Sequence, residues 1–245
     1  KKKKKKNNTT TQISSVLYTG TNAAGTVGHG LSGPPDFAMI SEIGGSSNYN
    51  HWGWSRHLSG TSGGAGFWSG INTTNNWDNG VTTFHGGVTN TTVGWTASGQ
   101  YGNESGKQFN IFFFREVEGF SSIGFYHGNG YNVNPPEVKT GFRPKMILIK
   151  SVEGSGNWVI HTDQQDFNYN ERPLFLNLSN QEGTETGRGI IFLSDGFRIN
   201  NLGSPNADMN TDNIKYFYMA FAAHPTKYSA SSFFSDFSTS QNLTA

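Results

Sequence analysis

Asn76, Trp77 and Asp78 form the segment whose residue types best suit recognition chemistry. They lie in the run 75–79, inside a stretch rich in Gly, Thr and Asn that predicts a surface loop. A sugar ring stacks its apolar C–H face on an indole, while amide and carboxylate groups bind its hydroxyls. These three residues are therefore a candidate glycan-binding site, with a plain polar loop as the alternative.

Metal ligands are sparse in this sequence. The chain has seven His and no Cys, and no two His have the spacing of a zinc-binding helix. A two-His site at His51 and His57 is one alternative. A calcium site is another, in a segment without the order of an EF-hand that offers Asp163, Asp166, Asn168, Asn170 and Glu171. We expect polar loops at both places, and we predict no metal and no cofactor.

The carboxylates of the first half of the chain give no sign of paired acid–base chemistry. They are Asp36, Glu42, Asp78, Glu104, Glu116 and Glu118. None lies in an apolar strand context that would raise one pKa above that of a partner. The Gly-rich stretches also lack the strand-then-helix setting of a nucleophile elbow or a phosphate-binding loop. We predict that the protein is not an enzyme and has no catalytic residue; a glycan-degrading enzyme is the alternative.

Charge is unevenly placed along the chain. The formal net charge is +1, and the six lysines at the start supply a third of the 18 basic residues. The remainder is mildly acidic, so the folded part has no general attraction for nucleic acid, and we expect no nucleic-acid partner.

Two terminal arms are predicted to serve in assembly. Residues 1–12 can bury almost nothing, so this arm alone should be disordered; it would hold an acidic neighbour, with a solvated tail as the alternative. Residues 229–245 carry Phe among Ser and Thr, and such Phe residues dock onto their own domain or a neighbouring subunit. The candidate anchor residues are Lys1, Lys2, Lys3, Lys4, Lys5, Lys6, Phe233, Phe234 and Phe237.

The composition favours strands and turns. Hydrophobic residues make up 33% of the chain and aromatic residues 14%, with 32 Gly, and no amphipathic helical pattern of useful length is present. Without Cys there can be no disulfide. No apolar run approaches the length of a membrane span, and no signal peptide is visible.

The second half of the chain repeats the first at an offset of roughly one hundred residues, the size of a compact β-sandwich. The segment 16–20 returns at 123–128, and the aromatic run 109–114 returns at 216–221. Trp52 is matched with Trp158. The junction 118–122 is short, so we expect a fixed tandem.

The predicted architecture is all-β, with two tandem β-sandwich repeats of jelly-roll or lectin-like type at 13–119 and 120–228. Trp52, Trp54 and Trp68 fall in predicted strands and are expected in the core. Met146 to Ile149 reads as a strand covered on both faces, by the twin repeat or by another subunit. Asp195-Gly196 predicts a two-residue hairpin turn. The predicted strands are 16–19, 36–41, 51–55, 65–68, 93–96, 108–117, 124–127, 137–140, 145–151, 158–161, 174–178, 190–193, 196–199 and 215–223.

Five stretches of the second repeat, followed by Pro225 and Lys227-Tyr228, form an ordered pattern. They are Tyr126 to Gly130, Thr140 to Lys150, Ser155 to Trp158, Ser194 to Phe197 and Tyr218 to Ala222. In order and spacing they resemble a repeat of tail-fibre and other structural proteins of marine phages that infect cyanobacteria and pelagic bacteria. The first repeat keeps the frame but lacks the Gly-Phe-Arg-Pro segment. The resemblance implies a virion appendage or surface component and carries over no catalytic residue.

From these observations we expect a non-enzymatic phage virion protein, a tail-fibre or capsid-surface subunit that packs with other virion subunits. By analogy with the family it would be a homo-oligomer, with a trimer as the first candidate. A glycan-binding adhesin that recognises a host-surface glycan is the alternative. The expected location is the virion.

Overall fold

The computed structural model describes a chain built of antiparallel β-sheets. It covers residues 5–8, 12–44, 51–58, 67–75, 84, 87–96, 102–131, 133–164, 172–179, 188–200 and 208–223. Among these residues the single helical element is the 3-10 turn η1 (Arg56–Leu58). The prediction of an all-β protein is confirmed. No helix in the described part of the chain is long and apolar enough to span a membrane.

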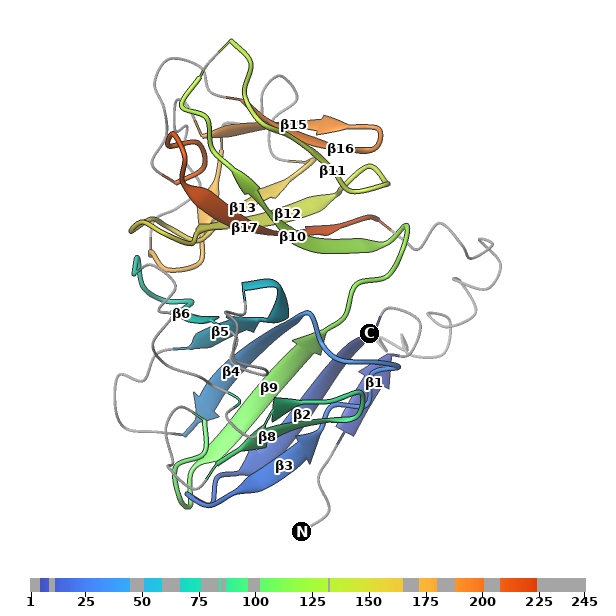
Figure 1. Cartoon of the computed structure of the whole chain (residues 1–245), viewed down its shortest axis with the longest axis vertical. Coiled ribbons are helices and arrows are strands. Elements are labelled where there is room, and N and C mark those ends of the chain that lie inside the picture. Colours follow the sequence, from blue (N-terminus) through green and yellow to red (C-terminus); the bar gives the residue numbers. More distant parts are fainter. Residues whose placement is uncertain are drawn as a thin grey trace, which may run out of the picture.

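The first half contains two sheets (Figure 1). A six-stranded sheet has the order β1-β2-β9-β4-β5-β6, and a three-stranded sheet has the order β3-β8-β7. Their bounds are β1 Lys5–Asn8, β2 Ile13–Thr19, β3 Gly25–Gly28, β4 Phe37–Ile43, β5 Trp52–Ser55, β6 Phe67–Gly70, β7 Gly87–Val88, β8 Thr92–Trp95 and β9 Gln108–Phe114.

The second half, which lies beyond the first along the long axis in Figure 1, also contains two sheets. A five-stranded sheet has the order β10-β17-β12-β13-β14, and a three-stranded sheet has the order β11-β16-β15. Their bounds are β10 Ser121–His127, β11 Glu137–Lys139, β12 Met146–Ser151, β13 Val159–Thr162, β14 Leu174–Phe175, β15 Gly189–Leu193, β16 Gly196–Asn200 and β17 Lys215–Phe221.

The two halves have the same strand order. Shifting strand numbers by eight converts β2-β9-β4-β5-β6 into β10-β17-β12-β13-β14, and β3-β8-β7 into β11-β16-β15. The last strand in sequence of each large sheet is an interior strand: β9 pairs antiparallel with β2 and β4, and β17 pairs antiparallel with β10 and β12. The first half adds only β1 at its edge.

Each half has its own apolar core between its large and its small sheet. In β9 burial alternates along the strand, so that Phe109, Ile111 and Phe113 are fully buried. They meet Val93 and Trp95 of the small sheet. The second core joins both sheets of its half in the same way and includes Tyr126, Val138, Ile147, Ile149, Val159, Ile190, Phe197, Ile199, Met209, Tyr216, Tyr218 and Ala220.

The prediction that residues 1–12 are wholly disordered was wrong for Lys5–Asn8. This segment is β1, which pairs with β2 so that Lys5 lies opposite Val16 and Asn8 opposite Ile13. Pairing to a free sheet edge uses backbone groups, so it does not need the apolar side chains that the prediction took as the criterion.

The predicted repeat needs correction in one residue match and in its list of strands. Trp52 pairs with Ile40 and Val159 pairs with Ile149, so the residue equivalent to Trp158 is His51, one position before Trp52. A shift of one residue in a strand turns the side chain to the other face. The strands β1, β3 and β7 were not predicted; β3 and β7 are short, and Gly and Thr make up most of β3.

The predicted hairpin between β15 and β16 is confirmed, but its turn is Ser194-Asp195, because Leu193 pairs with Gly196. Gly196 belongs to β16. It serves close packing rather than a turn, since a Cβ there would lie 2.0 Å from the carbonyl oxygen of Val138 on β11.

Candidate functional site

The two halves meet through an apolar contact between their large sheets. The first half contributes Phe37 of β4 and Ile71, which follows β6. The second half contributes Ile123, Leu148, Val152, Trp158, Phe217 and Met219. All are buried, so this contact is a third core, shared by the halves.

The apolar strand β12 shows how one segment serves two cores. Ile147 and Ile149 point into the core of the second half, while Leu148 lies in the contact with the first half. The prediction that Met146 to Ile149 is covered on both faces is confirmed for these three residues, and the cover on the second face comes from the same chain.

Trp158 contributes both apolar packing and a hydrogen bond to the contact between the halves. Its side chain is fully buried, and its Nε1 donates a hydrogen bond of 3.0 Å to the carbonyl oxygen of Gly70 in the first half. Gly53 makes room for it, because a Cβ there would come within 3.2 Å of Phe37 and 3.4 Å of the indole. Phe37 in turn stacks on Phe217, with ring centroids 5.3 Å apart.

A fully buried lysine stands at the edge of this contact. Lys150 Nζ donates to the carbonyl oxygens of Thr74 at 3.1 Å and Gly156 at 2.5 Å. Burial lowers the pKa of Lys150 to about 8, and the Asp208 carboxylate opposes this shift in part. Because Thr74 belongs to the first half, this cation also ties the halves together.

A polar network fixes the backbone that carries Trp158. The buried carboxylate of Asp208 accepts hydrogen bonds from the backbone N–H of Asn157 at 2.7 Å and from Arg188 Nε at 2.8 Å. Asn177 accepts from the N–H of Trp158 at 2.9 Å and donates to the side-chain oxygen of Asn157 at 2.8 Å. The indole is therefore held in place from its backbone as well as from its ring.

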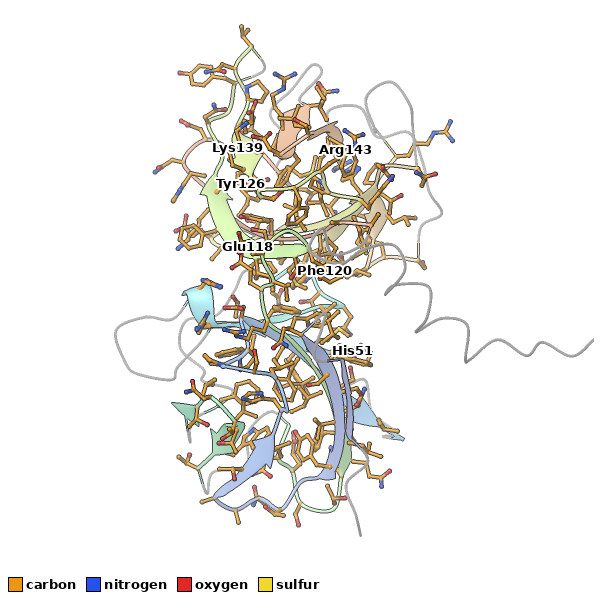
Figure 2. All side chains as sticks on the ribbon, turned by 90° about the vertical axis from the view of Figure 1, so that its right-hand side faces the viewer. His51, Glu118, Phe120, Tyr126, Lys139 and Arg143 are labelled. Atoms are coloured by element: carbon orange, nitrogen blue, oxygen red, sulfur yellow. The ribbon has the colours of Figure 1, made fainter. Side chains whose placement is uncertain are left out.

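A charged cleft of about 450 Å³ opens beside the junction of the two halves. Figure 2 shows Glu118 and Phe120 in the waist between them. The cleft is lined by Asp36, Arg56, Arg115, Glu116, Glu118, Gly119, Ser121, Thr140 and Gly141.

Asp36 is the electrostatic centre of this cleft. Its Oδ1 contacts Arg56 in an ion pair and His57 Nε2 at 3.0 Å, and its Oδ2 accepts from the N–H of Glu116 at 2.7 Å. Burial by itself would raise the pKa of Asp36, but the hydrogen bonds from His57 and Glu116 and the Arg56 charge outweigh it and lower the pKa. The group is ionised at neutral pH, which suits a structural anchor and not a general acid.

The second half holds an ion pair of opposite polarity at the equivalent place. The N–H of Arg56 donates to the carbonyl of Asp36, and the N–H of Asp163 donates to the carbonyl of Lys145, both at 3.1 Å. Asp36 is thus equivalent to Lys145, and Arg56 to Asp163, with the charges exchanged. The first pair ties the residue before β4 to the residue after β5, and the second ties the residue before β12 to the residue after β13.

Most of the predicted site residues lie outside the described part of the chain. Asn76, Trp77 and Asp78 belong to this group, as do Lys1 to Lys4 and Phe233, Phe234 and Phe237. Lys5 and Lys6 are described as backbone of β1. The glycan-binding and anchoring roles of these residues remain predictions.

The two-His alternative is not brought together by the fold. His51 precedes β5 and contacts the Ser41 hydroxyl at 2.9 Å, whereas His57 follows β5 and contacts Asp36. Of the oxygen-rich segment, Asp163 is described and pairs with Lys145. Residues 165–171 lie outside the described ranges, and within those ranges no group of three or more His, Cys, Asp or Glu could hold a metal ion.

Sequence reasoning missed two buried charges. Lys150 directly follows the apolar residues Met146 to Ile149 of β12. A lysine inside an apolar strand could have indicated a buried charge. Asp36 follows Pro34-Pro35 at the start of β4, but its partners Arg56 and Glu116 come from 20 and 80 residues away, so no local pattern revealed it.

The fold and these contacts define an all-β protein whose two halves share one buried contact. A family model described as "Domain of unknown function (DUF7483)" matches residues 4–225. The chain belongs to this family, and the matched region includes both halves. No curated protein and no solved structure matches the chain.

Proposed function

We propose that this protein is a non-enzymatic structural subunit of a phage virion, at the particle surface or on a tail fibre. The observation that carries the proposal is the contact around Trp158. It joins the halves through a buried apolar core, a hydrogen bond to Gly70 and the Lys150 ammonium group. A chain built in this way acts as one stiff element, which suits a load-transmitting part of a particle.

We further infer that the halves are tandem copies of one β-sandwich. The identical strand order supports this, and so do matched details. Gly20 and Gly128 each leave no space for a Cβ, which would come 2.2 Å and 2.1 Å from a carbonyl oxygen. Asn103 and Asn210 each accept a hydrogen bond from the N–H that follows this glycine.

Packing with other copies of the chain is part of the proposal. Leu174, Leu176 and Leu178 are 39%, 45% and 40% exposed, and they alternate along and beyond β14, an outermost strand of its sheet. An exposed apolar edge of this kind supports contact between subunits. A trimer, by analogy, is the proposed state, with the arms at 1–12 and 229–245 as anchors to other virion subunits.

Imaging of purified virions from the source of this chain with a gold-labelled antibody tests the proposal. Label on the shell or tail is expected, and its position separates a capsid-surface component from a fibre. Protein found free in the medium with no label on particles contradicts it. The glycan-binding adhesin then becomes the function to test, with Trp77→Ala as the first variant.

A further inference from the structure

The loop between β10 and β11, residues 128–136, presents two uncovered apolar side chains. Tyr131 is 68% exposed and Val133 is 97% exposed. Figure 1 shows this loop at the far end of the second half, away from the junction of the halves. Exposed apolar residues at the tip of a domain mark a surface available to a partner.

Side-chain hydrogen bonds fix the backbone that carries Tyr131. Asn210, which is fully buried, accepts from the N–H of Asn129 at 2.9 Å and donates to the carbonyl of Tyr131 at 3.2 Å. Asn129 accepts from the N–H of Tyr131 at 3.1 Å and donates to the carbonyl of Asn134 at 2.7 Å. Four bonds thus hold the ring outward on a set backbone, which lowers the entropy that binding would cost.

The first half provides an internal comparison. There Asn103 accepts from the N–H of Thr21 at 3.0 Å and donates to the carbonyl of Ala23 at 2.9 Å. Ala23 therefore stands where the second half has Tyr131. The loop of the first half also has five residues between its strands, whereas that of the second half has nine. The fold does not need an aromatic side chain here, so Tyr131 and the longer loop are additions specific to the second half.

Exposed polar groups lie near the backbone that carries Tyr131. Gly130 lies against Asp212, since a Cβ on Gly130 would come 3.1 Å from the Cβ of Asp212. Asp212 is exposed, and among the described residues its carboxylate has no hydrogen-bond or ion-pair partner. Asn134 is exposed as well. A carboxylate therefore lies against the residue before Tyr131, and an exposed amide follows three residues after it.

We propose that this tip binds a neutral saccharide. The Tyr131 ring would stack on the C–H face of a sugar, while the Asp212 carboxylate accepts hydrogen bonds from its hydroxyls and the Asn134 side chain donates or accepts one. Two apolar side chains are too few for the core of a standard protein interface, which buries about 800 Å² on each partner. The negative charge of Asp212 disfavours acidic sugars.

This site consists of other residues than the candidate site at Asn76, Trp77 and Asp78, and it adds a recognition role to the proposed structural one. A virion subunit with such a tip would contact a host surface through the second half. The two proposals are tested independently, because particle labelling reports location and saccharide binding does not.

The test uses the full chain on an array of multivalent neutral and acidic saccharides, since avidity makes weak single-site contacts measurable. We expect binding to neutral saccharides that falls about ten-fold or more in Tyr131→Ala, which restores the residue type of Ala23. Asp212→Asn should weaken it as well. Ile43→Ala, at an exposed apolar residue of the first half, is the matched control and should bind like the wild type, with thermal melting of all variants unchanged.

Three results would overturn the proposal. The first is an array on which the wild type binds no neutral saccharide. The second is binding that Tyr131→Ala leaves intact. The third is a Tyr131-dependent interaction with a host envelope protein stripped of its glycans and none with saccharides, which would make the tip a protein-binding site.

Discussion

The indole nitrogen of Trp158 donates a hydrogen bond to the carbonyl of Gly70, 88 residues earlier in the chain. This bond crosses from the second half to the first inside a buried apolar contact. It joins the residue before β13 to the end of β6. Hydrogen bonds of Asp208 to Asn157 and of Asn177 to Trp158 also fix the backbone of this segment. The two halves are therefore coupled by packing and not only by the short linker between β9 and β10.

Trp158→Ala should destabilise the whole chain. It removes a fully buried indole and leaves the Gly70 carbonyl without this donor, which together cost about 3–5 kcal/mol in the free energy of unfolding. Urea denaturation followed by circular dichroism measures the loss. Leu176→Ala, at an exposed position of the same half, is the control and should cost less than about 1 kcal/mol. Equal losses for the two substitutions would show that the contact around Trp158 contributes little to the free energy of unfolding.

Asp36 should make the free energy of unfolding depend on pH in the acid range. Its folded pKa is lowered, so its contribution is present above its unfolded pKa of about 3.9 and is lost as the pH falls through the folded value. Asp36→Asn should cost about 1–3 kcal/mol at pH 7 and flatten the acid side of the stability curve. Melting temperatures from pH 2 to pH 7 provide the measurement. Asp195→Asn, on the exposed pair with Lys139, is the control, and parallel curves for Asp36→Asn and wild type would refute the assignment.

Lys150 should also make stability rise with pH, but in the alkaline range, because here burial disfavours the charged form. Its pKa is lowered to about 8 in the folded chain, so between pH 8 and its unfolded pKa near 10.4 the unfolded state binds more protons. Stability from this group therefore rises with pH, by roughly 1 kcal/mol between pH 7 and pH 9. Lys150→Met should abolish that rise. Urea midpoints at pH 7, 8 and 9 for both proteins test it, and a rise that persists in the variant would contradict the burial of the charge.

The glycines that open the equivalent loops should be intolerant of a side chain. In Gly128→Ala the new Cβ would lie 2.1 Å from the Thr211 carbonyl oxygen, and in Gly20→Ala 2.2 Å from that of Glu104. Because backbone must move in both cases, we expect losses of about 3 kcal/mol. Gly25→Ala, whose nearest neighbour is 3.9 Å away, should stay close to wild type in the same denaturation assay. A well-tolerated Gly128→Ala would remove one support for equivalence of the halves.

The strand pattern was predictable because it is local. Alternation in the run 108–117 and the echo of that run at 215–223 led to β9 and β17 with errors of a few residues at their ends. The match of Trp52 with Trp158 failed because residue type alone cannot fix a strand register. Trp52 faces the core of the first half, and Trp158 faces the contact between halves.

The charged groups of the site were less predictable. Asp36, Arg56 and Glu116 meet only after β4, β5 and β9 have paired, and Lys150 reaches Thr74 across the contact between halves. The partners of these groups are set by long-range packing, so local spacing did not reveal the Asp36 cluster. For Lys150 the local sign was a lysine that continues an apolar strand. The candidate site at Tyr131 was found by comparing the loops of the two halves. That comparison needs the hydrogen bonds of Asn103 and Asn210, which show that Ala23 and Tyr131 are equivalent.

Native-state hydrogen exchange on β9 and β17 tests the central claim that the two halves form a single stiff unit. Both are interior strands of the two large sheets, paired on each side. If the shared contact couples them, amides of Ile111 and Tyr218 should exchange with the same free energy of opening, and Trp158→Ala should lower both together. Different opening free energies in the wild type, with β9 unaffected by Trp158→Ala, would contradict the account.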